Sequence, residues 1–331
     1  MDAKITKERL SRMLSYDWLK IVGLALAAIL VWTLIFTMTA TRITPAQQFT
    51  VINYTGNVST LFTSVNETLN DALKDGIFSY EVMENTLVDV GGNEEYGTTL
   101  METRVSTYEG DVVFVADIDN PNTEYEVNGE KRYDTYLDNL VNGYYAKIMN
   151  LDPEDPEGYF QRMEKFLNGF YGGNYKTGTR DDQAIKSAFL ARIKKNKDKR
   201  FKKDAQIKQG IQDEIERIAK YRDALIEFYG YLDAGLVAFS KTQLVDYNNN
   251  RAVLREGIYS INLCPDKEKM PNLDKIVAYK KTVKDEAGNE QSFPSAENMN
   301  VALLDFPQVE ESFEYESLLY INYVIRLSKA A

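Results

Sequence analysis

The sequence predicts an α/β domain preceded by one transmembrane helix, and two observations carry this prediction. Residues 21–41 contain no charged side chain. Between residues 49 and 118, segments with strand-like and helix-like hydrophobic spacing alternate as strand, helix, strand, helix and strand. That order is typical of a sheet of parallel strands with helices on both faces. The hydrophobic content of 44% agrees with a packed core of ordinary size.

The first element expected is a membrane-spanning helix over residues 21–41. Its 21 residues would reach roughly 30 Å, the thickness of the hydrocarbon core of a bilayer. Five basic residues precede this run, whereas only Arg42 follows it before Lys74. The positive-inside bias therefore predicts a single-pass plasma-membrane protein, with a cytoplasmic lead over residues 1–20 and residues 42–331 outside. A cleaved signal peptide is the alternative, although its apolar region normally has only about 7–15 residues.

The alternating segments come next, and each has its own signal. In the first helix, Val65, Leu69 and Leu73 recur at the helical period, and Gly76 stands where a C-terminal glycine belongs. Residues 112–116 (VVFVA) are apolar throughout, as in a strand buried on both faces. In chain order, we expect a strand at 49–53, a helix ending near residue 76, β-rich residues at 78–90, a helix over 96–105 and a strand at 112–116.

After residue 120 the sequence is mainly helical, and strands return late. In chain order, we expect helices over 133–149, 159–171 and 206–232, a basic segment between 181 and 208, strands at 257–263, 276–281 and 300–306 with a polar turn at 284–291, and an aromatic helix from about residue 311. This pattern allows two lobes within residues 42–331. One would hold residues 42–120 with the late strands, and the other residues 121–256.

Composition excludes several kinds of site. The chain has no histidine and one cysteine, Cys264, which excludes Ser–His and Cys–His nucleophile pairs and histidine-ligated metals. We therefore expect no cofactor and no enzymatic activity. The net charge of −11 argues against nucleic acid as a partner. Residues 181–210 depart from this balance with ten basic and four acidic side chains, which suits either an anionic polymer or lipid headgroups, or a solvated helix or loop.

Candidate ligand-binding residues follow from the expected sheet. Ligands of open α/β sheets bind at the carboxyl ends of strands, which points to two residues after the first strand and two aspartates after the third. Tyrosines of the helical region would add stacking faces for a sugar, although most tyrosines in proteins serve packing. The six candidates are Asn53, Tyr54, Asp117, Asp119, Tyr171 and Tyr229.

Oxygen-bearing side chains also gather between residues 117 and 124, as in calcium loops. Pro121 and Asn122, however, occupy positions where an EF-hand loop needs a ligand and a glycine. We therefore predict a solvated loop here and no metal site.

Several segments resemble the first lobe of extracellular solute-binding proteins of ABC importers: FTVINY, FSYEVMENTLVDVG and EGDVVFVAD, the last spanning residues 109–117. The later segments YRDALIEFYGYLDAGLVAFSKTQL and GIYSINL resemble a second-lobe helix and a strand returning through the hinge. The resemblance covers about half of the outer domain. This chain departs from the family in lacking a lipid-anchor cysteine and in being short for two full lobes.

The resemblance implies a periplasmic-binding-protein-like sheet, an oligosaccharide as ligand and an ABC permease as partner. It implies a function accessory to carbohydrate import, with the membrane helix holding the protein beside its permease. Two alternatives stay open. One is a cell-surface scaffold that contacts only proteins, through the basic segment or the C-terminal aromatic helix. The other is a glycan-processing enzyme.

Overall fold

The computed structural model describes residues 7–39, 48–55, 59–77, 82–89, 94–284, 288–306 and 311–329. Contacts within the chain separate two units, residues 1–44 and residues 45–331, and each is described by itself. Parts of the predicted strand at 78–90 and of the predicted turn at 284–291 lie outside the described residues. The division of residues 42–331 into two lobes stays a prediction.

The first unit contains one long helix, α1 (Lys7–Thr39). Its stretch Trp18–Thr37 is long and apolar enough to cross a membrane, and all of its side chains are exposed. The hydroxyl of Thr33 donates to the carbonyl oxygen of Ile29 at 2.8 Å, and that of Thr37 donates to the carbonyl oxygen of Thr33 at 2.8 Å. These hydroxyls are therefore satisfied within the helix, as a lipid environment requires.

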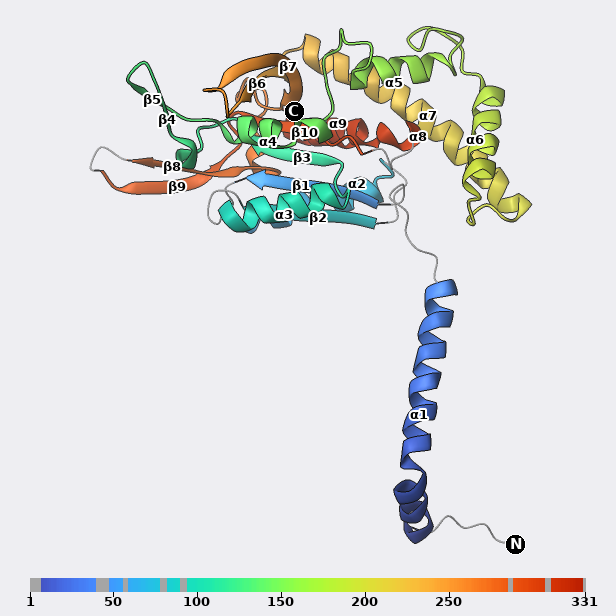
Figure 1. Ribbon diagram of the computed structural model, residues 1–331. Helices are drawn as coiled ribbons and strands as arrows, with labels where there is room; N and C mark the ends of the chain where they lie inside the picture. The colour runs from blue at the N-terminus through green and yellow to red at the C-terminus, as the bar shows by residue number, and fades with distance from the viewer. Residues whose placement is uncertain are drawn as a thin grey trace. The chain divides into compact units, whose positions relative to one another are not determined.

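The second unit is built on a six-stranded sheet of order β2-β1-β3-β10-β7-β6 (Figure 1). β1 pairs in parallel with β2 and β3, which confirms the predicted strand–helix–strand–helix–strand order of this half. The other three pairings are antiparallel, so the sheet is mixed. The strands are β1 (Gln48–Thr55), β2 (Val82–Asp89), β3 (Val112–Ala116), β6 (Ala238–Asp246), β7 (Ala252–Asn262) and β10 (Met299–Leu303).

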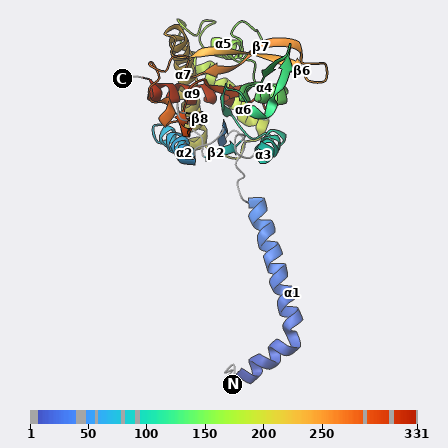
Figure 2. The ribbon, with the colours of Figure 1, turned by 90° about the vertical axis from the view of Figure 1, so that its left-hand side faces the viewer.

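Helices cover both faces of the sheet, as predicted. Alternate strand residues point to opposite faces, so Val51 joins a core with α2, α5, α7 and α9, and Ile52 joins a second core with α3 and α4. Figure 2 shows α2 and α3 on opposite sides of β2. The helices are α2 (Ser59–Lys74), α3 (Glu94–Ser106), α4 (Tyr136–Tyr144), α5 (Tyr159–Asn168), α6 (Asp182–Asn196), α7 (Asp204–Asp233), α8 (Glu311–Glu314) and α9 (Glu316–Ser328), with 3₁₀ turns at Pro121–Thr123, Tyr145–Lys147 and Leu273–Lys275.

Two small hairpins extend from one end of this unit, and α6 lies at the other end (Figure 1). They are β4 (Tyr125–Val127) with β5 (Glu130–Arg132), and β8 (Tyr279–Lys284) with β9 (Glu290–Ser295). The first corrects the expectation that the chain is mainly helical after residue 120. Asn128 and Gly129 both have positive φ, 54° and 85°, as the tightest hairpin turns require.

β6 is a second correction, because no strand is predicted between the helix at 206–232 and the strand at 257–263. Its partner β7 begins at Ala252, five residues before the predicted strand at 257–263. The two strands pair from Ala238↔Asn262 to Asp246↔Ala252 and make the longest ladder of the sheet. Their turn places Asn250 and Arg251 at positive φ, 48° and 59°. This turn and the β4–β5 hairpin both border the candidate site.

Candidate ligand-binding cavity

A cavity of about 570 Å³ lies between the β4–β5 hairpin, α4 and the β6–β7 turn. Its volume falls in the range of small-molecule sites in proteins, about 300–1,000 Å³. The lining combines carboxylates, amides and guanidinium groups with the side chains of one tyrosine and three valines. Its polar members include Tyr125, Glu126, Arg132, Asp134, Asp138, Asn142, Gln243, Asn250 and Arg251.

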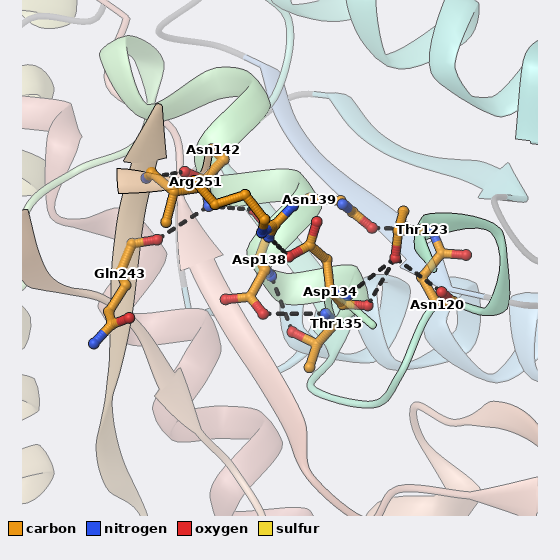
Figure 3. Close-up of polar contacts among 10 residues, drawn as sticks. Asn120, Thr123, Asp134, Thr135, Asp138, Asn139, Asn142, Gln243 and Arg251 are labelled. Atoms are coloured by element: carbon orange, nitrogen blue, oxygen red, sulfur yellow. Dashed lines mark hydrogen bonds and ion pairs between the residues drawn. The ribbon is translucent and has the colours of Figure 1, made fainter. Parts of the chain in front are cut away.

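An ion pair between Asp134 and Arg251 joins two walls of the cavity (Figure 3). Asp134 is only 4% exposed. The guanidinium carbon of Arg251 also lies 3.8 Å from the ring centroid of Tyr125 and 4.9 Å from that of Tyr247. Such stacking and pairing fix the guanidinium in one orientation. The cation is thus balanced within the protein, and the walls are held together by residues distant in sequence.

The loop between β3 and α4 positions Asp134 through backbone contacts. Thr123 Oγ1 accepts the Asp134 amide at 3.0 Å and donates to the Asn120 carbonyl oxygen at 2.9 Å. The Asn120 amide donates to the Asp134 carbonyl oxygen at 2.8 Å, and Asn120 Nδ2 donates to Asn139 Oδ1 at 2.9 Å. Figure 3 shows these contacts as a continuous network. Because the loop satisfies its own polar groups, it is a fixed wall of the cavity.

Asp138 belongs to a capping box at the start of α4. Its carboxylate accepts the Thr135 amide at 3.0 Å, and Thr135 Oγ1 accepts the Asp138 amide at 3.0 Å. Burial raises the pKa of the Asp138 carboxyl, although the hydrogen bonds from Thr135 oppose this effect. The nearby carboxylates of Asp117 and Asp134 raise it further. The cavity wall therefore carries a carboxyl group that gains a proton more readily than a solvated aspartate.

Asn142 connects α4 to the sheet. Its Nδ2 donates to the carbonyl oxygen of Gln243 at 3.1 Å, and its Oδ1 accepts the Val245 amide at 2.8 Å. The amide group thus extends the hydrogen bonding of β6 at the edge of the sheet. Amides, carboxylates and guanidinium groups supply donors and acceptors to a polar ligand, while Tyr125 and the valines supply apolar surface.

The predicted residues after the first strand are used inside the protein. Asn53 is 5% exposed, and its Nδ2 donates to Asn85 Oδ1 at 2.5 Å across β1 and β2. Tyr54 is buried in the core that includes α3 and α4. By contrast, Asp117 lies close enough to Asp138 to affect its pKa, and Asp119 forms an isolated β-bridge with Thr135. The structure brings the two aspartates, but not Asn53 or Tyr54, toward the cavity.

Tyr171 and Tyr229 lie in the helical region of the unit. Tyr229 donates its hydroxyl to Glu164 Oε1 at 3.0 Å, and the guanidinium carbon of Arg222 lies 5.2 Å from the Tyr171 ring centroid. Both rings pack against the larger core. None of the six predicted residues is among those that line the cavity. Within the described ranges, no cluster of three or more acidic or cysteine side chains could hold a metal ion, including residues 117–124.

Sequence reasoning missed the residues that do line the cavity, above all Tyr125, Asn142 and Arg251. A usable signal was present. The Asn-Gly pair at residues 128–129 follows the strand formers Tyr125 and Val127, and NNN at residues 248–250 precedes Arg251. Asn-Gly and asparagine-rich turns are among the strongest short-range indicators of hairpins. They predict the two turns, but not that both turns lie beside α4.

Comparison of this chain with protein-family models, curated proteins and solved structures found no match. The resemblance to solute-binding proteins therefore rests on the quoted segments alone.

Proposed function

We propose that this protein is a membrane-anchored binding protein that holds a small polar ligand in the cavity between the β4–β5 hairpin, α4 and the β6–β7 turn. The single observation that carries the proposal is the cavity itself, with fixed walls and a lining rich in side-chain donors and acceptors. Preformed walls favour binding because fewer side chains lose freedom when a ligand enters.

The ligand class that suits this lining is a neutral polyhydroxylated molecule such as an oligosaccharide. Arg251 is already paired with Asp134, so it leaves no unbalanced cation for a ligand anion at that position. Amide and carboxyl groups exchange hydrogen bonds with hydroxyl groups in both directions. The exposed parts of Tyr125, Val127 and Val253 would pack against the carbon-bearing faces of a sugar ring.

Membrane anchoring by α1 completes the proposal. The basic residues before the apolar run favour, by the positive-inside bias, a cytoplasmic N-terminus and a second unit outside. Anchoring raises the local concentration of a binding protein beside a permease, so a weak contact suffices for handover of a sugar. An ABC permease is thus the proposed partner, and nucleic acid is not, because of the acidic balance of the chain.

The alternative of a pure interaction scaffold loses one of its two predicted surfaces. α9, the C-terminal aromatic helix, is buried over almost its whole length, with Tyr320 and Val324 at 0% exposure. It is a core element between other helices and the sheet, so the prediction that it offers a contact surface is wrong. The basic segment between residues 181 and 208 remains available to a partner.

Calorimetry of the full chain in lipid nanodiscs against a panel of oligosaccharides tests the proposal. Glu126→Gln changes a cavity carboxylate, whereas Glu130→Gln makes the same change on the same hairpin outside the cavity. A hydrogen bond to a charged group contributes about 1.5–3 kcal/mol, so we expect Glu126→Gln to weaken binding about tenfold or more and Glu130→Gln to leave it unchanged. No binding of any sugar, together with co-purification of a permease, would instead support the scaffold.

A further inference from the structure

The basic segment forms a folded arm, which we define as α6, the first half of α7 and the turn between them, residues 182–217. α6 and α7 pack side by side, and the arm lies at the end of the unit opposite the hairpins (Figure 1). Its tip, residues 194–208, carries eight basic and two acidic side chains, a net charge of +6. No part of the proposed ligand cavity uses this surface.

The arm has its own small core, which distinguishes it from a mobile loop. The rings of Phe189 and Phe201 meet edge to face with centroids 5.0 Å apart. A Cβ added to Gly210 would come within 2.5 Å of Phe201 and 2.6 Å of Phe189, so only glycine allows α7 to pack this closely. The tip is therefore presented in a defined shape.

Arginines and lysines have different roles in the arm. Arg192 forms a two-pronged ion pair with Glu214 at 2.7 and 2.8 Å, and Arg200 pairs with Asp198 at 2.7 Å. The lysines of the tip are exposed, and none has an ion pair with any described residue. They are Lys194, Lys195, Lys197, Lys199, Lys202, Lys203 and Lys208. The arginines thus stabilise the arm, while the lysines leave a concentrated positive charge directed at solvent.

We propose that this lysine surface binds the anionic lipid headgroups of the membrane that α1 spans. Lysine ammonium groups act as compact point charges, which suit a diffuse anionic surface better than one shaped ligand. Each lysine near an anionic bilayer strengthens binding roughly fivefold. Most of the rest of the chain is acidic and would be repelled by an anionic membrane surface. The arm is therefore the part of the second unit that would bind such a membrane.

The length of chain between the two units limits how far β1 can lie from the end of α1. From Thr39, the end of α1, to Gln48, the start of β1, the polypeptide can extend at most about 32 Å. This limit holds for any arrangement of the two units. The proposal rests on the membrane anchoring given under the proposed function, and it is independent of which ligand the cavity takes.

A fluorophore on the arm, in full-length protein reconstituted in nanodiscs, tests the proposal. The label is attached through Ala205→Cys, an exposed position, in a Cys264→Ser background. Nanodiscs of phosphatidylcholine alone are compared with nanodiscs containing about one-third phosphatidylglycerol, both with headgroup-quencher lipids. We expect quenching to be several-fold stronger in the anionic nanodiscs. It should disappear at about 0.5 M salt, because the attraction between lysines and headgroups then extends over only a few ångströms.

Two sets of lysine variants distinguish binding through the arm from an effect of the overall charge of the protein. The arm variant is Lys195→Gln, Lys197→Gln, Lys199→Gln and Lys202→Gln. The matched control removes four exposed lysines elsewhere: Lys241→Gln, Lys267→Gln, Lys280→Gln and Lys284→Gln. We expect the arm variant to lower the ratio of docked to undocked protein at least tenfold, and the control to leave it within about twofold.

Three outcomes would overturn the proposal. They are equal quenching in neutral and anionic nanodiscs, equal effects of the two lysine variants, and binding of soluble polyphosphate without any response to lipid charge. Protein that does not enter nanodiscs at all would overturn the membrane anchoring and this inference together. Sugar binding measured in neutral nanodiscs is unaffected by the first three results, so failure of the arm and failure of the cavity are distinguishable.

Discussion

The six-stranded sheet has a parallel half, β2, β1 and β3, and an antiparallel half, β10, β7 and β6. The two halves differ in whether their strands extend beyond the packed core. In the parallel half, the Asn53 side chain near the end of β1 is buried and hydrogen-bonded within the sheet. In the antiparallel half, β7 pairs with β10 only through Ile261 and Asn262, and the rest of its length runs with β6 past the core. Val253, at the far end of β7, is 56% exposed and lines the cavity. The candidate site therefore forms where strands extend beyond the packed layers.

The largest expected effect on stability comes from the ion pair between Asp134 and Arg251, beside the antiparallel half of the sheet. Arg251→Met leaves the Asp134 carboxylate buried without its counter-charge, which we expect to lower the free energy of unfolding by about 3–5 kcal/mol. Adding Asp134→Asn should recover most of this loss. Urea denaturation of the full chain in detergent measures both variants.

An exposed ion pair between β6 and β7 provides the control. Lys241 and Glu256 lie 3.4 Å apart, and Lys241→Gln should change stability by less than about 1 kcal/mol. If Arg251→Met is no more harmful than this control, the two hairpins and α4 are not held together by the buried pair. The contrast between the halves of the sheet would then be weaker than described.

The parallel half should respond to pH through a buried acid. Asp111 precedes β3, and its carboxylate accepts the Thr50 amide of β1 at 2.7 Å. Burial raises the pKa of Asp111 to about 7, with the Thr50 hydrogen bond opposing and the nearby Glu316 carboxyl adding to the shift. Burial likewise raises the pKa of Glu316 to about 7, although Arg217 and the Tyr221 hydroxyl oppose it.

The sign of the effect follows from proton binding. Between about pH 4 and pH 7 these two carboxyls keep protons in the folded protein that they have lost in the unfolded chain, so their contribution to stability is greatest at low pH and falls as pH rises through this window. A pKa raised to about 7 corresponds to at most about 4 kcal/mol of folding stability contributed by Asp111. We expect Asp111→Asn to reduce the loss between pH 5 and pH 8, whereas Asp233→Asn, an exposed change of the same charge, should not. A melting temperature that rises over this range would contradict the prediction.

The smallest effects come from a matched pair of valines. Val113, in β3, has no exposed surface, whereas Val253 is 56% exposed. Val113→Ala should cost about 2–3 kcal/mol through lost burial and the cavity left behind. Val253→Ala should change stability by about 0.5 kcal/mol or less. Equal costs, measured by urea denaturation, would mean that the end of β7 is packed as firmly as the parallel half.

The parallel half could be predicted from sequence because its signals are local. The apolar run at 112–116 matches β3 in both bounds, and the glycine at residue 76 ends α2 with the positive φ that helix ends favour. β2 follows β1 through the single helix α2 and pairs with it in parallel, whereas β3 follows β2 through α3 but pairs with β1. The crossover rule therefore supplies the parallel direction of these strands, but not their order in the sheet.

The antiparallel half and the cavity could not be predicted in this way. β10 pairs with β3 across about 180 residues, and no local pattern states which edge of the sheet it joins. β6 begins with alanine, phenylalanine, serine and lysine, a composition equally suited to a loop after α7. Asn142 and Arg251 acquire their roles only when α4 and the β6–β7 turn meet, so residue type alone could not identify them.

The late position of β10 in the sequence also determines when the sheet can be completed during synthesis. Among the described strands, Met299–Leu303 alone joins the two halves of the sheet, and it is synthesised about 180 residues after β3. At synthesis rates of about 5–20 residues per second, β3 waits roughly ten to forty seconds, and β7 about two to seven seconds, with a strand edge that has no final neighbour. Open edges of this kind pair readily with other chains. Final assembly of the sheet is thus a late, long-range event, which predicts slow folding and an interval in which a chaperone would protect the nascent chain.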